Sequence, residues 1–266
     1  MKTIFIGAGN VAWHLAMLFF KNKNVQITHI WSRNKENAEL LKDKLDKNIE
    51  IYHSLDSLDF SKTDADLAIL SIADGAFESV LSKLILPKNC ILAHTSGAQP
   101  MEILKLANYN SIKNIGVFYP LQTFSKAKEV DFSSIPFCIE ANNKEIEEKL
   151  TSLANQFSQK VFQVSSKDRS ILHVAAVFVC NFSNYLWTIS ETILKEKNLP
   201  FDMMKPLLEE TLQKALEINP SNAQTGPAIR NDEKVIEKHL NMIEEMNLNS
   251  NFSRIYKLMT ESIQQK

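Results

Sequence analysis

Glycine is scarce in this chain, with six among 266 residues, and cysteine is scarcer still, with three. Cys90, Cys138 and Cys180 lie far apart among apolar neighbours, and none forms a CxxC motif. Such isolated cysteines, odd in number, indicate buried reduced thiols in a reducing compartment rather than a disulfide-stabilised secreted fold. The sequence also lacks an HExxH motif or a Cys/His cluster, so we expect no metal.

Two further absences restrict the partners. Lys and Arg total 30 against 31 for Asp and Glu, so no basic excess exists to hold a phosphate backbone, and we expect no nucleic acid. Polar residues interrupt the longest apolar stretch, 171–187, which falls short of the ~20 predominantly apolar residues of a membrane span. The N-terminus begins with a strand pattern rather than a signal peptide. We therefore expect a cytoplasmic protein that contacts no membrane.

Two of the six glycines stand one residue apart, in the stretch IFIGAGNVA. The run before them is typical of a buried parallel strand, and NVAWHLAMLFFKN has the apolar spacing of a helix. Gly7, Gly9 and Ala12 thus occupy the fingerprint positions of GxGxxG/A. Gly9 would let a pyrophosphate approach the backbone, while the helix N-terminus at Asn10 and Val11 offers free N–H groups. The pattern predicts a dinucleotide site.

The end of the next predicted strand, VQITHIWS, indicates which dinucleotide binds. An NAD enzyme carries an Asp or Glu there, ~20 residues after the glycines, for the ribose 2′-hydroxyl. This chain has Ser32 and Arg33 instead, which can hydrogen-bond and pair with a 2′-phosphate. Although an exposed arginine is common in loops, its presence where an acid is expected favours NADP.

Strand and helix patterns alternate as far as residue 165. The helical patterns include one that Asn34 would cap and another that Asn142 or Asn143 would cap. This alternation predicts an α/β fold with a doubly wound parallel sheet, forming a Rossmann domain over residues 1–165. Further predicted strands are 64–72, 89–97, 111–120, 135–141 and 160–165, and predicted helices are 34–45, 74–84, 100–107 and 143–157.

The strand signal stops after residue 165. The segment 167–198 could form one helix of ~28 residues. Pro200, Pro220 and Pro227 punctuate the chain after it, where three more helical segments are predicted, 201–218, 231–246 and 249–264. We expect an all-helical second domain over residues 166–266. Three modest helices cannot cover a long apolar helix with few charges, so we also expect a homodimer through the C-terminal helices.

Ligands of open α/β sheets bind beyond the carboxyl ends of the strands. Small residues and glycines gather at these ends in LSIAD and LAHTSG, which suggests a backbone close to a ligand. We expect the nicotinamide ribose and ring to contact five of them, namely Ser71, Ile72, Thr95, Ser96 and Gly97.

His173 begins the apolar part of the long helix. At 100° per residue, Asn184 lies within ~20° of it and Asn181 ~80° away, so one side carries three polar groups among apolar ones. One interpretation is that they are satisfied core residues, with the asparagines bonding between subunits. Alternatively, this face closes over the nicotinamide, with His173 exchanging a proton with a substrate C=O or C=N. Thr225, in TGPAIRND, belongs either to a simple helix–helix turn or to the substrate pocket.

The stretches GAGNVA, WSR, HTSGA, YPLQTFS, HVAAVFVCNF and TGPAIRND resemble bacterial Rossmann-like proteins that carry a DUF2520 C-terminal domain. The resemblance covers nearly the whole chain. That family is described as predicted NADP-dependent oxidoreductases, within the group of 6-phosphogluconate dehydrogenase, ketopantoate reductase and pyrroline-5-carboxylate reductase. The resemblance implies an N-terminal Rossmann domain and a helical C-terminal domain that commonly dimerises.

The chain also departs from its relatives. In ketopantoate reductases and hydroxyacid dehydrogenases of the group, a lysine and asparagines on the long helix act on the substrate. Here that helix offers His173, Asn181 and Asn184 without the lysine, and Tyr119 stands where the family has a histidine before proline. We expect these three helix residues and Thr225 to serve a small polar metabolite.

The leading hypothesis is therefore an NADP(H)-dependent oxidoreductase that transfers a hydride to or from a C=O or C=N group. Two alternatives remain open. One is a non-catalytic regulator or scaffold that binds NADP(H), and the other is an enzyme that uses a related nucleotide such as a deazaflavin.

Overall fold

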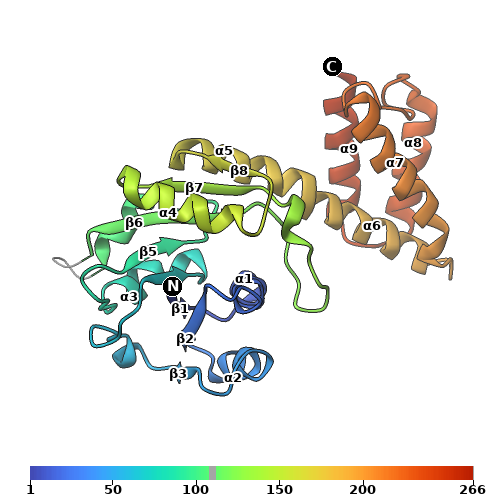
Figure 1. The fold of residues 1–266 in the computed structure, drawn as a ribbon. Helices are drawn as coiled ribbons and strands as arrows, with labels where there is room; N and C mark the ends of the chain where they lie inside the picture. The colour runs from blue at the N-terminus through green and yellow to red at the C-terminus, as the bar shows by residue number, and fades with distance from the viewer. Residues whose placement is uncertain (108–111, 266) are drawn as a thin grey trace. The chain divides into compact units, whose positions relative to one another are not determined.

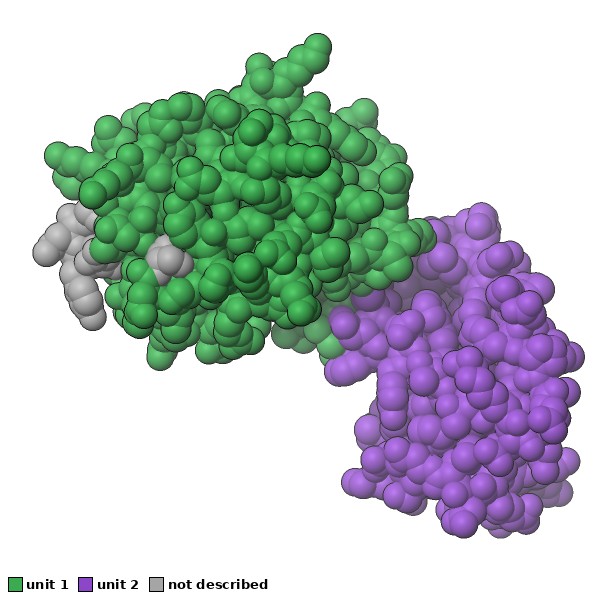
Figure 2. Space-filling model, turned by 90° about the horizontal axis from the view of Figure 1, so that it is seen from below, with its two compact units in different colours: residues 1–178 green, residues 179–266 purple. Residues whose placement is uncertain are grey.

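The computed structural model describes residues 1–107 and 112–265. The chain divides into two compact units, Met1–Phe178 and Val179–Lys266 (Figures 1 and 2). The first unit contains the sheet, and the second is helical wherever it has regular structure. The domain boundary expected after residue 165 precedes helix α5 (Ser166–Ala176), which this division groups with the sheet.

In the described part of the chain, eight strands form one sheet in the order β3-β2-β1-β4-β5-β6-β7-β8. Strands β1 to β6 pair in parallel, and the strand order reverses between β1 and β4. The carboxyl ends of β1 and β4 thus form the switch point where α/β sheets bind ligands. The strands are β1 (Lys2–Ile6), β2 (Gln26–Trp31), β3 (Glu50–Tyr52), β4 (Leu67–Leu70), β5 (Ile91–His94), β6 (Asn114–Pro120), β7 (Phe137–Ala141) and β8 (Val161–Gln163).

The last two strands depart from the purely parallel sheet that the sequence predicted. Strand β7 is antiparallel to β6, and β8 is parallel to β7. The cause is the connection between β6 and β7, whose regular structure is one 3₁₀ turn, Phe132–Ser134, rather than the crossover helix that a parallel return requires. Strand β3 was not predicted, because its three residues are too few to show a period.

The helices of the first unit cover both faces of the sheet. Apolar side chains of α1 (Asn10–Phe20), α2 (Lys35–Lys44) and α4 (Lys144–Asn155) pack on one face with Phe5. Those of α3 (Phe77–Leu81) pack on the other face with the neighbours of Phe5 in β1, Ile4 and Ile6. This alternation along β1 follows from the two-residue period of a strand. The predicted helix 100–107 is a 3₁₀ segment, Met101–Leu106, and the predicted strand 111–120 begins at Ser111, outside the described residues.

The predicted long helix exists but is not uniform. It runs from α5 through a π-helical segment, Val177–Phe182, into α6 (Ser183–Lys195). Because a π-helix does not advance by 100° per residue, the angles predicted between His173 and the two asparagines do not hold. By length and composition Ser166–Lys195 could cross a membrane, contrary to the expectation from its polar residues, although core helices of other proteins meet the same criterion.

The second unit continues after α6 with a 3₁₀ turn, Phe201–Met204, and three α-helices. These helices fall within the three predicted helical segments, 201–218, 231–246 and 249–264. Asp232 caps α8 by accepting a hydrogen bond from the backbone N–H of Val235. The three helices are α7 (Lys205–Ile218), α8 (Glu233–Glu245) and α9 (Asn251–Gln264).

The aromatic cluster around Phe19 provides a test of the fold. The ring of Phe19 is fully buried and lies 5.5 Å from Phe5 and 5.3 Å from Phe157, centroid to centroid. Phe19→Ala should therefore lower the free energy of unfolding by ~3–5 kcal/mol in urea titrations followed by circular dichroism. The adjacent Phe20 is 45% exposed, so Phe20→Ala should cost less than ~1 kcal/mol. Equal losses for the two variants would contradict this packing.

Candidate cofactor and active site

The turn after β1 requires glycine at its first fingerprint position. Gly7 has φ +119°, a conformation that residues with a side chain rarely adopt. A Cβ atom there would lie 1.9 Å from the backbone oxygen of Ser71, at the end of β4. The Gly7 backbone N–H also donates to the Trp31 carbonyl oxygen at 2.7 Å. The turn at Gly7 therefore contacts the carboxyl ends of both neighbours of β1, namely β2 and β4.

Gly9 has a different environment. A Cβ atom added there would meet no protein atom within 4 Å. Gly9 is the N-cap of α1, whose first turn has neither a side-chain cap nor an acidic residue. Helices α2, α4 and α5 are all capped by side chains, which leaves the N–H groups of α1 available to an outside acceptor. The open space and the free donors fit a pyrophosphate.

A cavity of about 460 Å³ opens over this helix terminus and the carboxyl ends of β1, β2, β4 and β5. Of the residues predicted to bind the cofactor, all but Gly97 line it. They are Gly7, Gly9, Asn10, Val11, Ser32, Arg33, Ser71, Ile72, Thr95 and Ser96. The structure thus brings these residues together, while their contacts with a bound cofactor remain a prediction.

The part of the cavity beyond β2 is suited to a phosphate group. Ser32 is buried, whereas Arg33 is exposed and has no carboxylate partner among the ion pairs of the described residues. The side chain of Asn34 caps α2 by accepting from the Asn37 N–H, and both asparagines line the cavity. An unpaired guanidinium beside a helix N-terminus favours a bound dianion.

The loop after β5 is held in shape by side-chain hydroxyls. Thr95 Oγ1 donates to Ser71 Oγ at 3.0 Å, which joins the ends of β5 and β4. Ser96 Oγ donates to Asp74 Oδ1 at 2.7 Å and accepts from the backbone N–H groups of Ala98 and Gln99. Because its hydroxyl is fully used in this way, Ser96 shapes the loop as well as lining the cavity.

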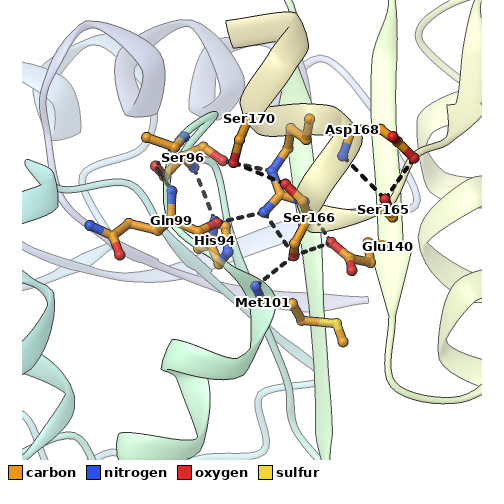
Figure 3. A network of polar contacts seen from close by, with 11 residues as sticks. His94, Ser96, Gln99, Met101, Glu140, Ser165, Ser166, Asp168 and Ser170 are labelled. Carbon is orange, nitrogen blue, oxygen red and sulfur yellow. Dashed lines mark hydrogen bonds and ion pairs between the residues drawn. The ribbon is translucent and has the colours of Figure 1, made fainter. Parts of the chain in front are cut away.

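Arg169 on α5 fixes the same loop from outside, and the sequence analysis missed it. Its side chain is completely buried and forms an ion pair with Glu140 at 2.6 Å. The guanidinium also donates to the backbone oxygens of Ser96 and Gln99, at 3.2 and 2.5 Å. Figure 3 shows these partners converging, with Ser166 bonded to Glu140 and to the Met101 N–H. Two of the acceptors are backbone carbonyls, which leave no signature in a sequence.

His94, at the end of β5, is a structural residue. Its side chain is fully buried, and burial lowers the pKa of its imidazole to about 3. Its Nδ1 accepts from the Ser96 N–H at 3.1 Å, and its ring packs edge-on against Phe77. A neutral, enclosed imidazole of this kind cannot contact a substrate directly.

His173 lies beside the loop after β5, which lines the cavity with Thr95 and Ser96. A Cβ atom on Gly97 would come 2.5 Å from the His173 Nδ1, so the absence of a side chain there makes room for the imidazole. That Nδ1 is 3.2 Å from the hydroxyl of Tyr119, at the end of β6. Tyr119 is buried, and burial raises the pKa of its phenol to about 12. The first unit therefore places a histidine and a protonated tyrosine next to the loop after β5.

The other predicted catalytic residues belong to the second unit. Asn181 and Asn184 are exposed. Thr225 lines a cavity of about 300 Å³ together with apolar side chains such as Leu186 and Ile243. Among the described residues, no cluster of three His, Cys, Asp or Glu side chains could hold a metal ion. The structure thus describes His173 in the sheet unit and the other three candidates in the helical unit.

Comparison with known proteins gives a match along the whole chain. A candidate NADP oxidoreductase from Bacteroides fragilis, BF3122, is 38% identical, with a TM-score of 0.88, and the match covers 100% of this chain and 98% of that one. The family model described as NADP oxidoreductase, coenzyme F420-dependent, matches residues 2–95, and DUF2520, a domain of unknown function, matches residues 135–263. Fold, cavity and relatives together define an NADP-dependent oxidoreductase. More particularly, the chain belongs to the family of NADP oxidoreductases that carry a DUF2520 domain.

More distant structures share the fold. Protein TM1727 from Thermotoga maritima matches with a TM-score of 0.73 at 22% identity, covering 99% of this chain and 100% of that one. A Streptomyces aurantiacus imine reductase matches with a TM-score of 0.60 at 13% identity, covering 100% and 94%. The search among curated proteins found no match.

The two glycines of the turn should respond differently to substitution. Gly9→Val should fold, with a loss of at most ~1 kcal/mol at the N-cap, but its side chain would project into the cavity and abolish the rise in Tm that NADPH causes. Gly7→Ala should lower the Tm without any ligand, because its Cβ collides with backbone. Differential scanning fluorimetry with and without NADPH measures both effects. A normal NADPH response in Gly9→Val would contradict the assignment of the pyrophosphate site.

Proposed function

We propose that the protein transfers a hydride between NADP(H) and the C=O or C=N group of a small polar metabolite. The observation that carries this proposal is the position of His173, which is half-buried, bonded to Tyr119 and packed against Gly97 in the loop of the cofactor cavity. A proton-transfer group next to the expected nicotinamide position is what a carbonyl or imine reduction requires.

The hydrogen bond between Tyr119 and His173 orients the imidazole. At 3.2 Å the Tyr119 hydroxyl can accept from an Nδ1–H as well as donate to Nδ1. In the reduction that we propose, His173 acts as an imidazolium whose Nδ1–H donates to the Tyr119 oxygen. Its Nε2 proton passes to the oxygen or nitrogen of the substrate as the hydride adds to carbon, which leaves a neutral imidazole.

The remaining residues of the site bind and orient. Bound NADPH supplies the hydride chemistry. The first turn of α1 would hold the pyrophosphate, and Ser32 with Arg33 would hold the 2′-phosphate. The Ser71–Thr95 bond and the Arg169 network keep the loop after β5, which would contact the nicotinamide, in one conformation. Asn181, Asn184 and Thr225 are proposed to orient the substrate, since amide and hydroxyl groups are the usual partners of small polar metabolites.

An assay of NADPH oxidation distinguishes two other functions from this one. A regulator or scaffold would bind NADPH tightly without turnover. A deazaflavin-linked enzyme is favoured by the description of the family model over residues 2–95, and it would oxidise NADPH only when a deazaflavin acceptor is present.

The variant His173→Ala tests the catalytic proposal. With imines, 2-oxo acids and aldehydes as substrates and absorbance at 340 nm as the readout, its kcat should fall ~10²–10⁴-fold, because the proton donor is lost. Tyr119→Phe should lower kcat less, ~10-fold, because only the hydrogen bond that orients the imidazole is lost. Both variants should bind NADPH as the unaltered protein does, since neither residue lines the cavity.

The controls separate this proposal from the alternatives. Tight NADPH binding without turnover on any substrate would favour the regulator. Measurable turnover that His173→Ala leaves unchanged would show that another group moves the proton.

We also propose that the protein is a cytoplasmic homodimer through its C-terminal helices. In the helical unit, Val179, Leu212 and Leu216 are 77%, 62% and 76% exposed, so this unit has apolar surface that a second copy would cover. Cys90 and Cys138 are buried and Cys180 is half-buried, and all three are free thiols, which accords with a reducing compartment.

Sedimentation velocity without detergent tests the dimer. The unaltered protein should sediment as a dimer at micromolar concentration, and Val179→Asp should shift it to a monomer, because a charge would be buried at the interface. Leu40→Asp is the matched control, since Leu40 is 55% exposed but lies on α2 in the sheet unit. A monomeric unaltered protein would rule out this interface.

A further inference from the structure

The segment that joins β6 to β7 contacts α1 and α2, whose first turns border the cofactor cavity. We call residues 121–131 the strap. Asn10 Nδ2 donates to the Phe124 carbonyl oxygen at 3.0 Å, and His14 Nε2 donates to that of Ser125 at 2.9 Å. The rings of His14 and Phe124 also pack 5.2 Å apart. The strap, the long loop beside α1 in Figure 1, is therefore tied to the first turns of α1.

The strap brings a lysine to the cofactor cavity. Lys126 Nζ donates to Asn37 Oδ1 at 3.0 Å and lies 5.0 Å from the ring centroid of Trp13. Asn37 is one of the residues that line the cavity, next to Arg33 and Asn34. A cation from a distant part of the chain thus lies at the edge of the cavity where the second strand ends.

The electrostatics of this position favour a bound anion. Asn37 is in the first turn of α2, where the helix dipole contributes partial positive charge. Neither Lys126 nor Arg33 has a carboxylate partner among the ion pairs of the described residues, whereas Lys35 is paired with Glu39. Two cations beside a helix N-terminus repel one another and the dipole. A dianion between them would relieve that repulsion.

We propose that Lys126 is a specificity residue that binds the 2′-phosphate of NADP(H) together with Arg33. This inference rests on the cofactor site proposed above. The strap delivers the ammonium group, and the contacts of Asn10 and His14 fix its position. The preference for NADPH over NADH then depends on two cations, of which the one on the strap lies outside the dinucleotide fingerprint.

The test compares three methionine variants, which remove the charge and keep an apolar side chain. Lys126→Met preserves packing on Trp13, Arg33→Met removes the other cation, and Lys128→Met is the control, since Lys128 is exposed on the same strap. Isothermal calorimetry measures binding of four probes to each protein. These are NADPH, NADH, adenosine 2′,5′-bisphosphate and 5′-AMP.

Lys126→Met should weaken NADPH and adenosine 2′,5′-bisphosphate ~10-fold, the usual worth of one charge-assisted hydrogen bond. NADH and 5′-AMP should bind within ~2-fold of the unaltered protein, and Lys128→Met should change nothing. Lys126→Arg should restore most of the loss, because arginine also donates to phosphate.

Two results would overturn the inference alone. If Lys126→Met weakens NADPH and NADH equally, the lysine only holds the strap in place. If it weakens neither, Lys126 does not contact the cofactor. If instead the unaltered protein binds no probe, the cofactor site itself is wrong.

Discussion

The structure depends on the close approach of two backbones, at Gly7 and Ser71. The first turn can pass against the end of β4 only because position 7 has no side chain. The turn lies at the switch point between β1 and β4, and Gly9, two residues further on, leaves the N-terminus of α1 without a side-chain cap beside the cavity. The residues predicted for the cofactor follow four strands, and they line one cavity because those strands are neighbours in the sheet.

A second set of contacts fixes the loop after β5, at the base of the cavity. Ser96, Gly97 and Gln99 form a loop whose hydroxyl and carbonyl groups are bonded to Asp74 and Arg169. The same loop makes room for His173 at Gly97. Helix α5 thus contacts the base of the cofactor cavity in two ways, through the hydrogen bonds of Arg169 and through the packing of His173 against Gly97. The bonds from Arg169 to this loop explain why the Arg169–Glu140 ion pair is buried here, although two apolar residues would cost less free energy to bury.

Local patterns were enough to predict much of this fold. The glycine fingerprint, the alternation of strands and helices, and the caps at Asn34 and Asn143 each depend on residues close in sequence. Features that depend on distant partners were missed or misjudged. Arg169 looked like an ordinary residue at a helix start, because two of its acceptors are backbone carbonyls. The strap has no period at all, and the π-helical segment preserves the apolar pattern while changing the angle between side chains.

The strap has a consequence for how the protein is made. Asn10 and Phe124 are 114 residues apart, and His14 and Ser125 are 111 apart. A chain synthesised from its N-terminus releases the glycine turn from the ribosome early, ~5–20 s before residue 126 at ordinary elongation rates. During that interval the nascent chain has its dinucleotide fingerprint and Arg33 but not the strap that bonds to α1 and α2. The contribution proposed for Lys126 to the choice between the two nicotinamide cofactors is therefore added late in synthesis, after most of the sheet has been translated.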